Sequence, residues 1–161
     1  MPGPILSPPG PDNDWQGGHV ARLVETFARA TGRDLVADMK LDPARLGRSA
    51  WDGDFALLSH RGDGQATMNY ANRFGLALWE TDWAGLIRMP SEATAPAQDV
   101  AERRVMMEEM AQRGFVSGYT GRRISAKGRL FMIENVTIWK LVDAKGQPFG
   151  AAATFKTFRR L

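Results

Sequence analysis

The sequence predicts an α+β domain with a five-stranded antiparallel sheet, helices packed on one face, and an amphipathic helix before the sheet. Two observations carry this prediction. Two short strand-like runs come early in the chain, and three longer runs follow one another at its end, with helical patterns between the two groups. The connections within each group are short and turn-like, which favours antiparallel pairing. At 161 residues the chain is long enough for one sizeable core and too short for two.

The chain is expected to divide into three parts. Residues 1–14 are rich in proline and glycine and predict a disordered tail, because they have neither the basic start nor the apolar run of a signal peptide. Residues 15–53 predict a helical leader, and residues 54–161 predict the sheet domain. From Gly18 to Thr31 apolar side chains recur at steps of three and four residues. This apolar stripe has two interpretations: it covers the domain's own core, or it pairs with a second subunit.

Short elements are expected after the leader helix. Asp42 and Pro43 predict the start of a short helix, which Gly47 would close. Residues 55–59 and 67–70 then predict the two arms of a hairpin, because the polar, glycine-containing turn HRGDG lies between them.

Helices are expected to fill the middle of the chain. Asn72 would cap one short helix and Thr81-Asp82 another, which ends at Pro90-Ser91. A longer helix is expected from Ala97 to Arg113, closed by Gly114. Its apolar side is formed by Val105, Met106 and Met110.

The last third of the chain predicts three consecutive strands, at residues 118–125, 128–142 and 148–158. The middle strand is apolar on both faces, which is typical of a strand in the centre of a covered sheet. Regular alternation would place its side chains in two opposed sets, Phe131, Ile133, Trp139 and Leu141 against Leu130, Met132, Val136, Ile138 and Val142.

Composition excludes several classes of protein. The chain has no cysteine, so disulfides, thiolate nucleophiles and iron–sulfur clusters are ruled out. The net charge of +3, from 21 basic and 18 acidic residues, is too small for a phosphate-binding stripe, and nucleic acid is not an expected partner. The close basic pairs are Arg103-Arg104, Arg122-Arg123 and Arg159-Arg160. No segment approaches the roughly 18 apolar residues of a membrane span, and a cytoplasmic location is expected.

Several motifs, taken in order, resemble the MEKHLA domain family, which is related to PAS domains. They are NYANRFGLALWE, MPSEATA, the helix start ERR, GYTGRRISAKGRLF, IENVTIWKLVD and GAAATF, and they extend roughly from Phe55 to Phe158. The resemblance implies a PAS-like fold and a regulatory association, because the domain occurs in plant homeodomain-leucine zipper regulators and in small stand-alone bacterial proteins. It implies no enzymatic activity.

The chain departs from the family pattern at three places. It has Trp139-Lys140 where the family commonly has WN, Gly150-Ala151-Ala152-Ala153 where the family has GQAA, and Glu92 where the family has an arginine. The lost amide removes a hydrogen-bonding group from the last strand. Haem-binding PAS domains generally offer a histidine on the long helix, which has none here, and flavin-adduct photosensors use a cysteine. A non-covalently held flavin or a small organic acid stays open as an occupant, and the cofactor is unassigned.

The candidate ligand-binding residues are polar or aromatic side chains that these patterns place near the predicted cavity between sheet and helices. They are His60, Tyr70, Asn72, Trp79, Trp83, Arg122, Glu134, Asn135 and Trp139. The leading hypothesis is a stand-alone, non-catalytic sensory module that binds a small ligand or a protein partner there and forms a homodimer through its N-terminal helix. The alternative is a small enzyme or cofactor carrier with a pocket around His60, Tyr70, Glu134 and Asn135. A third interpretation is an interaction module with a fully packed interior.

Two of these candidates also have structural interpretations. His60 would hydrogen-bond to close the HRGDG turn, since no HxH or HExxH spacing provides a metal partner and His19 is too distant along the chain to be paired by sequence. Glu134 would form a salt bridge to Arg122 or Arg123 on the adjacent strand, whereas the functional interpretation makes Glu134 or Asn135 a ligand anchor. No catalytic residue and no metal ligand is assigned.

Overall fold

The structure is a computed structural model, and it describes residues 7–37 and 40–161. Six strands form one antiparallel sheet in the order β2-β1-β5-β4-β3, with β6 paired to β4. The strands are β1 Ala56–Arg61, β2 Met68–Ala71, β3 Phe115–Ile124, β4 Leu130–Val142, β5 Pro148–Phe155 and β6 Thr157–Arg160. The helices are η1 Pro11–Gln16, α1 Gly17–Thr31, α2 Pro43–Trp51, α3 Arg73–Leu78, α4 Trp83–Leu86, η2 Ser91–Thr94, η3 Ala97–Asp99 and α5 Val100–Arg113. The expected α+β class and antiparallel sheet are confirmed.

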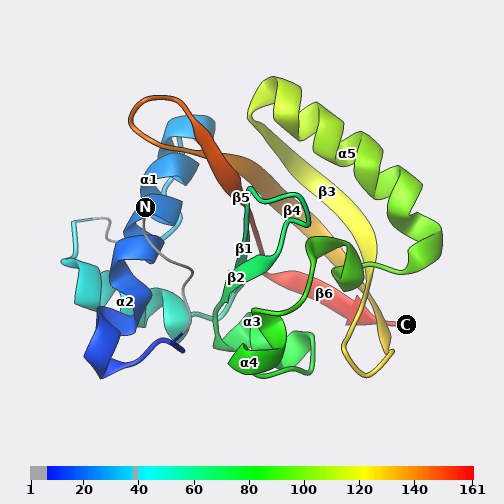
Figure 1. Ribbon diagram of the computed structural model, residues 1–161, viewed down its shortest axis with the longest axis horizontal. Helices are drawn as coiled ribbons and strands as arrows, with labels where there is room; N and C mark the ends of the chain where they lie inside the picture. The colour runs from blue at the N-terminus through cyan, green and yellow to red at the C-terminus, as the bar shows by residue number, and fades with distance from the viewer. Residues whose placement is uncertain (1–6, 38–39) are drawn as a thin grey trace.

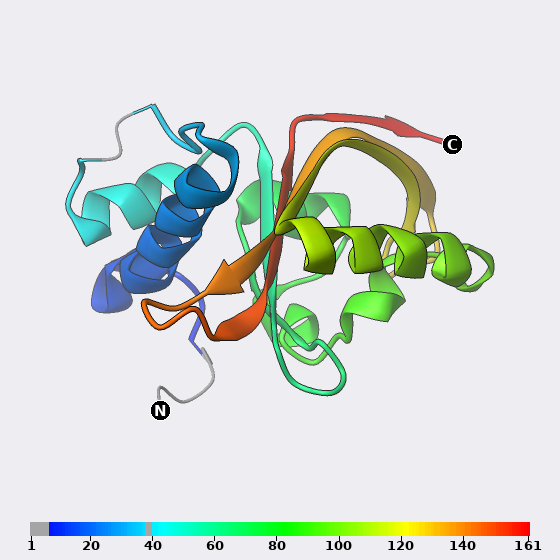
Figure 2. The ribbon, with the colours of Figure 1, turned by 90° about the horizontal axis from the view of Figure 1, so that it is seen from above.

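The helices cover the sheet from both sides (Figures 1 and 2). α1 and α2 lie on one side of the sheet, α5 lies on the other, and α3 and α4 pack against β1 and β2. Of the tail predicted at residues 1–14, residues 1–6 lie outside the described part, and the chain from Pro11 already forms η1. The division into a leader at 15–53 and a domain at 54–161 stays a prediction.

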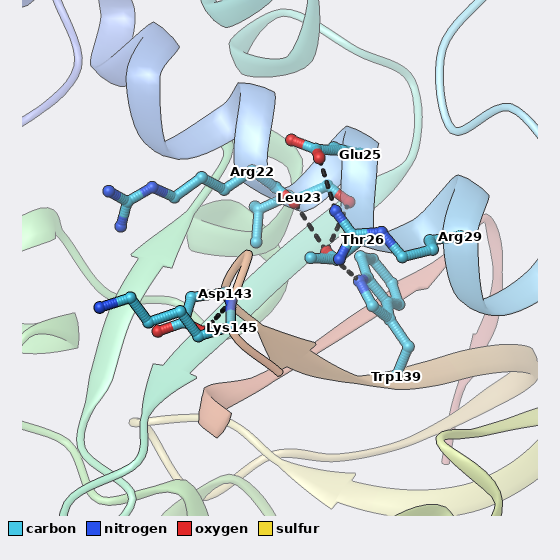
Figure 3. A network of polar contacts seen from close by, with 8 residues as sticks. All are labelled: Arg22, Leu23, Glu25, Thr26, Arg29, Trp139, Asp143 and Lys145. Atoms are coloured by element: carbon cyan, nitrogen blue, oxygen red, sulfur yellow. Dashed lines mark hydrogen bonds and ion pairs between the residues drawn. The ribbon is translucent and has the colours of Figure 1, made fainter. Parts of the chain in front are cut away.

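The apolar stripe of α1 packs on β4 of the same chain. Phe27 lies edge-on to Trp139 with 4.9 Å between ring centroids, and Trp139 is completely buried. The indole Nε1 of Trp139 donates to Thr26 Oγ1 at 3.0 Å, and Thr26 donates in turn to the Arg22 carbonyl at 2.7 Å (Figure 3). The amphipathic helix is therefore confirmed, and its stripe covers the sheet.

A β-bulge in β4 changes which side chains share a face. Asn135 has φ 53°, and the β3–β4 pairing passes from Tyr119 opposite Val136 to Gly121 opposite Ile133, so β4 contains one extra residue. The extra residue inverts the alternation beyond it. Phe131 and Ile133 therefore share the face of Val136 and Ile138, while Trp139 points to α1. The regular alternation expected from the sequence was wrong, because a bulge leaves no plain signal in the apolar pattern.

The predicted helix caps are confirmed. Asp42, Asn72 and Asp82 each accept a hydrogen bond from the backbone N–H three residues later, at 2.9, 3.1 and 2.8 Å. Gly32 and Gly114 close α1 and α5 in the left-handed conformation, with φ of 72° and 88°.

Three local expectations were wrong. Gly47 does not close α2 but lies inside it, where an added Cβ would be 2.5 Å from the Asp14 carbonyl oxygen. Its lack of a side chain lets η1 approach α2. Val105, expected on the apolar side of α5, is 65% exposed, whereas Met106 and Met110 are buried as expected. The predicted last strand is divided at Lys156 into β5 and β6, which pair with successive halves of β4.

Candidate ligand cavity

A cavity of about 60 Å³ lies between the sheet and the helices η2 and α5. Its floor comes from β1, β4 and β5, one side comes from Trp79 after α3, and its roof comes from η2 and α5. The side chains that line it include Leu58, His60, Met68, Trp79, Ser91, Arg103, Met106, Met107, Arg123, Ile133, Val136, Ile138 and Ala153.

The cavity exists because the strand beside β4 carries small side chains. Ala153 lies opposite Ile138 on one neighbouring strand and opposite Leu58 on the other, and Ala151 lies opposite His60. Larger residues at these inward positions would fill the space, as side chains do in close-packed cores. The run of alanines in β5, expected to matter only as a departure from the family pattern, is thus what leaves room.

The roof is formed by flexible side chains of α5. Met106 is 6% exposed, and Met107 lies one residue further along the same helix. Methionine has three rotatable side-chain bonds and adapts to irregular space at low cost. The roof can therefore adjust to an occupant without rebuilding the sheet.

Two arginines provide the charge at this cavity. Arg123 of β3 is 5% exposed; its Nη1 donates to the Arg122 carbonyl at 2.7 Å, and its guanidinium carbon lies 5.4 Å from the Tyr119 ring centre. Arg103 of α5 donates from Nη2 to Ser91 Oγ. Burial lowers the pKa of Arg103, and the charge of Arg123 lowers it further. Neither arginine lies within ion-pair distance of a carboxylate in the part of the chain that the structure describes.

His60 lines the cavity as a neutral side chain. Its Nδ1 lies 3.0 Å from the Arg61 carbonyl oxygen and donates to it, because a carbonyl can only accept. This tautomer leaves Nε2 as an acceptor. Burial lowers the pKa of His60 and outweighs the raising effect of this hydrogen bond. The contact with the neighbouring carbonyl resembles the turn-closing role expected for His60, and the ring is also exposed to the cavity.

A wider cleft of about 600 Å³ lies next to the cavity, between α5, η2 and the turn that joins β1 to β2. Ser91, Arg103 and Met107 line both the cavity and the cleft. These three side chains therefore lie at the boundary between the cavity and the cleft. The hydrogen bond between Arg103 and Ser91 links α5 to η2 at this boundary.

Of the nine candidate residues, two line the cavity: His60 and Trp79. Trp79 is 3% exposed; its Nε1 donates to the Thr94 carbonyl at 3.4 Å, and its ring lies edge-on to Phe131 at 5.0 Å. The lining described above does not include Tyr70, Asn72, Trp83, Arg122, Glu134, Asn135 and Trp139.

Two of these seven side chains form ion pairs elsewhere, and a third belongs to the bulge of β4. Arg122 forms a bidentate pair with Asp99, both contacts being 2.8 Å, which lowers the pKa of Asp99 and raises that of Arg122. Glu134 pairs with Arg159 of β6 at 2.7 Å. The expected salt bridge to Arg122 or Arg123 was wrong: Arg122 and Arg159 lie opposite Met132 on the two strands beside β4, and Arg122 is paired with Asp99, so Glu134 pairs with Arg159. Asn135 is the bulge residue itself.

Tyr70 and Trp83 belong to a second buried cluster, on the side of α1. Tyr70 lies 5.7 Å from the His19 ring and 6.1 Å from the Trp83 ring, measured between centroids. His19 Nε2 lies 2.9 Å from Ser59 Oγ, whose own hydrogen is donated to Asn69 Oδ1 at 2.6 Å. Nε2 therefore donates. Burial lowers the pKa of His19 to about 4, with a smaller effect from Arg22, and burial raises the pKa of Tyr70.

The sequence-based reasoning missed Arg103, Arg123 and the alanines of β5. From the sequence, Arg122 was a candidate ligand-binding residue and Arg123 a possible salt-bridge partner of Glu134, whereas Arg103 and Arg104 counted only as a close basic pair. One member of each pair points inward and the other outward: Arg104 is exposed, and Arg122 binds Asp99. Side-chain alternation along β3 could have marked one arginine of the second pair as inward.

Two further observations concern the described residues as a whole. No three His, Asp or Glu side chains among residues 7–37 and 40–161 gather closely enough to hold a metal ion. In the same part of the chain, every helix is too short or too polar to span a bilayer.

Sequence comparison matches residues 18–160 to the MEKHLA domain. The match therefore includes α1 and α2 as well as the sheet. A curated relative, the homeobox-leucine zipper protein ATHB-9 of Arabidopsis thaliana, is 27% identical over 128 residues. This alignment covers 75% of the present chain but only 15% of that protein.

Solved structures with a similar fold are PAS and light-oxygen-voltage domains. The PAS domain of a protein from Colwellia psychrerythraea has a TM-score of 0.62 at 14% identity, covering 73% of this chain and 94% of that chain. An RNA-binding light-oxygen-voltage receptor has a TM-score of 0.62 at 16% identity, covering 80% of this chain and 35% of that chain. The PAS domain, in complex with ethanol, of a LuxR-family transcriptional regulator from Burkholderia thailandensis has a TM-score of 0.54 at 22% identity, covering 71% and 95%.

At these identities the solved structures show the fold alone, which is the PAS fold predicted from the motif order. The match to the MEKHLA domain over residues 18–160 covers most of the chain and therefore shows the family as well as the fold. The chain belongs to the MEKHLA domain family.

Proposed function

We propose that this protein is a non-catalytic sensory or regulatory module that binds a small molecule in the cavity between the sheet and α5. The observation that carries the proposal is the half-open cavity of about 60 Å³ beneath Met106 and Met107. PAS and light-oxygen-voltage domains are generally sensory. One neighbour of this fold is described as a complex with ethanol, a molecule small enough for a space of this size.

The signal would pass through α5. An occupant that touches Met106 and Met107 also lies beside Arg103, whose hydrogen bond to Ser91 joins α5 to η2. Binding would therefore favour one position of this helix over others, which is how a ligand with different affinities for two states shifts their populations. The outer face of α5, where Val105 is exposed, is the surface on which a protein partner would detect the change.

The test is native mass spectrometry of the freshly purified full chain beside Ala153→Leu, which fills the cavity from its floor. Ala111→Leu on the exposed face of α5 is the matched control. We expect a copurified or added small molecule to be retained by the wild type and by Ala111→Leu and lost from Ala153→Leu. Equal retention by all three proteins would place the molecule elsewhere and contradict the proposal.

The alternative of a cofactor carrier or enzyme around His60, Tyr70, Glu134 and Asn135 has less support. Of these four residues only His60 lines the cavity, Tyr70 packs beside His19, and Glu134 pairs with Arg159. General acid–base catalysis requires its groups within hydrogen-bonding reach of one substrate.

Dimerisation through α1 and a cytoplasmic location stay predictions. The stripe of α1 that was expected to serve either the core or a second subunit packs on β4. A dimer would therefore use the polar outer face of α1, where Glu25 and Arg29 pair with each other. Light scattering of the full chain and of Glu25→Arg tests this: equal masses for both proteins, at the monomer value, would exclude the dimer.

A further inference from the structure

We propose that the occupant of the cavity is a small carboxylate anion, held by the guanidinium groups of Arg103 and Arg123 with its short apolar end on the sheet. This inference rests on the proposed function, because it names the chemical class of the ligand. It is drawn from charge, hydrogen-bonding capacity and size.

Other arginines near this end of the sheet are paired with carboxylates. Arg122, Arg129 and Arg159 have carboxylate partners at 2.8, 3.3 and 2.7 Å, although each of them is at least one-third exposed. Arg123, which is far more buried than these, has no such partner among the described residues. A buried cation without a counter-ion is costly in a folded protein, so charges in this position are normally paired. The carboxylate of Asp99, which pairs with Arg122, acts on Arg123 electrostatically but lies outside ion-pair distance of it, so Arg123 has no carboxylate of its own in the described part of the chain.

Arg103 adds a second cation to the same space. Both arginines line the cavity. They lie close enough together that the charge of Arg123 lowers the pKa of Arg103. Glu92 also acts on Arg103 electrostatically, but it lies outside ion-pair distance. His60 adds no compensating negative charge. Two like charges held close together beside the cavity repel each other, and an anion between them would offset that repulsion.

The hydrogen-bond donors are also available. The side-chain hydrogen bonds of Arg123 all start from Nη1, toward Arg122 and Tyr119, and that of Arg103 starts from Nη2, toward Ser91. Each guanidinium has five N–H donors in a planar fork, a geometry that suits the two oxygens of a carboxylate. The unused donors are on the two side chains that line the cavity.

The rest of the lining sets the size and polarity of the ligand. Leu58, Ile133, Val136 and Ile138 form an apolar floor, and the volume of about 60 Å³ is well below the roughly 150 Å³ of a cavity that admits benzene. A nucleotide or sugar phosphate does not fit. A carboxylate with a tail of a few carbon atoms does, and movement of Met106 and Met107 would set the upper limit of the tail.

The experiment is calorimetric titration of the full-length protein with propionate, and with propionamide and 1-propanol as neutral molecules of similar shape. Inorganic phosphate reports attraction of anions to the surface. The variants are Arg103→Met and Arg123→Met, which keep most of the side-chain volume, and Arg104→Met, the matched control one residue away on the exposed side of α5.

We expect propionate to bind at least tenfold more tightly than either neutral probe and than phosphate. Arg103→Met and Arg123→Met should each weaken propionate binding at least tenfold, and Arg104→Met should leave it within twofold. If Arg123→Met does not fold, Arg103→Met with the neutral probes carries the test alone.

The outcomes that overturn the inference separate it from the proposed function. Propionate, propionamide and 1-propanol could bind equally well, with all binding abolished by Ala153→Leu. This result would support the cavity as a ligand site and contradict its preference for an anion. If Ala153→Leu still binds propionate, with an affinity equal to that for phosphate, the binding is due to surface charge and the inference is wrong. If no probe binds at millimolar concentrations, the inference that the ligand is a small carboxylate is wrong. Native mass spectrometry would then test the proposed function independently.

Discussion

Trp139 of β4 donates its indole hydrogen to Thr26 of α1 across 113 positions of sequence, and this bond at 3.0 Å ties the N-terminal helix to the centre of the sheet. The same tryptophan meets Phe27 edge-on, so one side chain joins α1 to β4 by both packing and hydrogen bonding. The N-terminal helix is thereby part of the folded core, in agreement with a family match that begins at residue 18.

Removing the packing partner should destabilise the whole protein. Phe27→Ala is expected to lower the free energy of unfolding by about 3–5 kcal/mol, because it deletes a buried ring from the core. Glu25→Gln, which removes an exposed i,i+4 ion pair on the same helix, should change it by less than about 0.5 kcal/mol. Urea unfolding monitored by tryptophan fluorescence measures both. A small effect of Phe27→Ala, equal to that of the control, would mean that α1 is not docked on the sheet in solution.

Asn72 makes four hydrogen bonds while completely buried. Its Oδ1 accepts from Leu57 N and Gly75 N, both at 3.1 Å, and its Nδ2 donates to the Ala50 and Phe55 carbonyls at 3.0 and 2.7 Å. Asn72→Ala should cost about 3 kcal/mol or more, because it removes a helix cap and leaves buried backbone groups without partners.

Asp42→Ala provides the comparison for Asn72→Ala. Asp42 caps α2 at an accessible position through one hydrogen bond at 2.9 Å. Its loss should cost only about 1 kcal/mol. Thermal and urea unfolding of the two variants should differ clearly, and equal losses of stability would show that Asn72 acts only as a cap.

His19 should make the protein less stable in mild acid. The pKa of His19 is lowered from 6.5 to about 4, so between these values the unfolded chain binds a proton that the folded chain does not. Above pH 6.5 both states are neutral and the contribution is constant. As pH falls toward 4, the free energy of unfolding should decrease by up to about 3 kcal/mol.

His19→Gln keeps a polar side chain beside Ser59 and removes this titration. Its unfolding free energy should depend less steeply on pH between 6.5 and 4 than that of the wild type. Some dependence should persist, because the pKa of His60 is lowered in the same direction. Urea titrations at several pH values give both slopes, and identical slopes would contradict the burial of His19.

Much of the fold could be predicted from local patterns, because caps, turns and apolar periodicity act within a few residues. Asn72, Asp82 and the glycines after α1 and α5 fall in this class. The bulge at Asn135 could not be predicted, since it depends on the pairing of β4 with β3, and it alone decides that Trp139 points to α1 and Ile133 to the cavity.

The cavity was harder to predict than the fold. Aromatic and polar side chains were expected to line it, and His60 and Trp79 do. The other seven candidates serve as a helix cap, a bulge residue, members of ion pairs or packing groups, and a single sequence does not distinguish these roles from ligand contacts. The residues that shape the cavity most are small or flexible, such as Ala153 and Met106, and their importance comes from what lies opposite them in space.

The most direct test of a ligand-binding cavity is methyl NMR of the methionines during a propionate titration. Met68, Met106 and Met107 line the cavity, and Met132 on β4 does not. Saturable shifts are expected in the signals of the three lining methionines, with the signal of Met132 unmoved and all shifts absent in Ala153→Leu. Unchanged signals for Met106 and Met107 with propionate and with the neutral probes, or equal shifts in all methionines, would contradict the account.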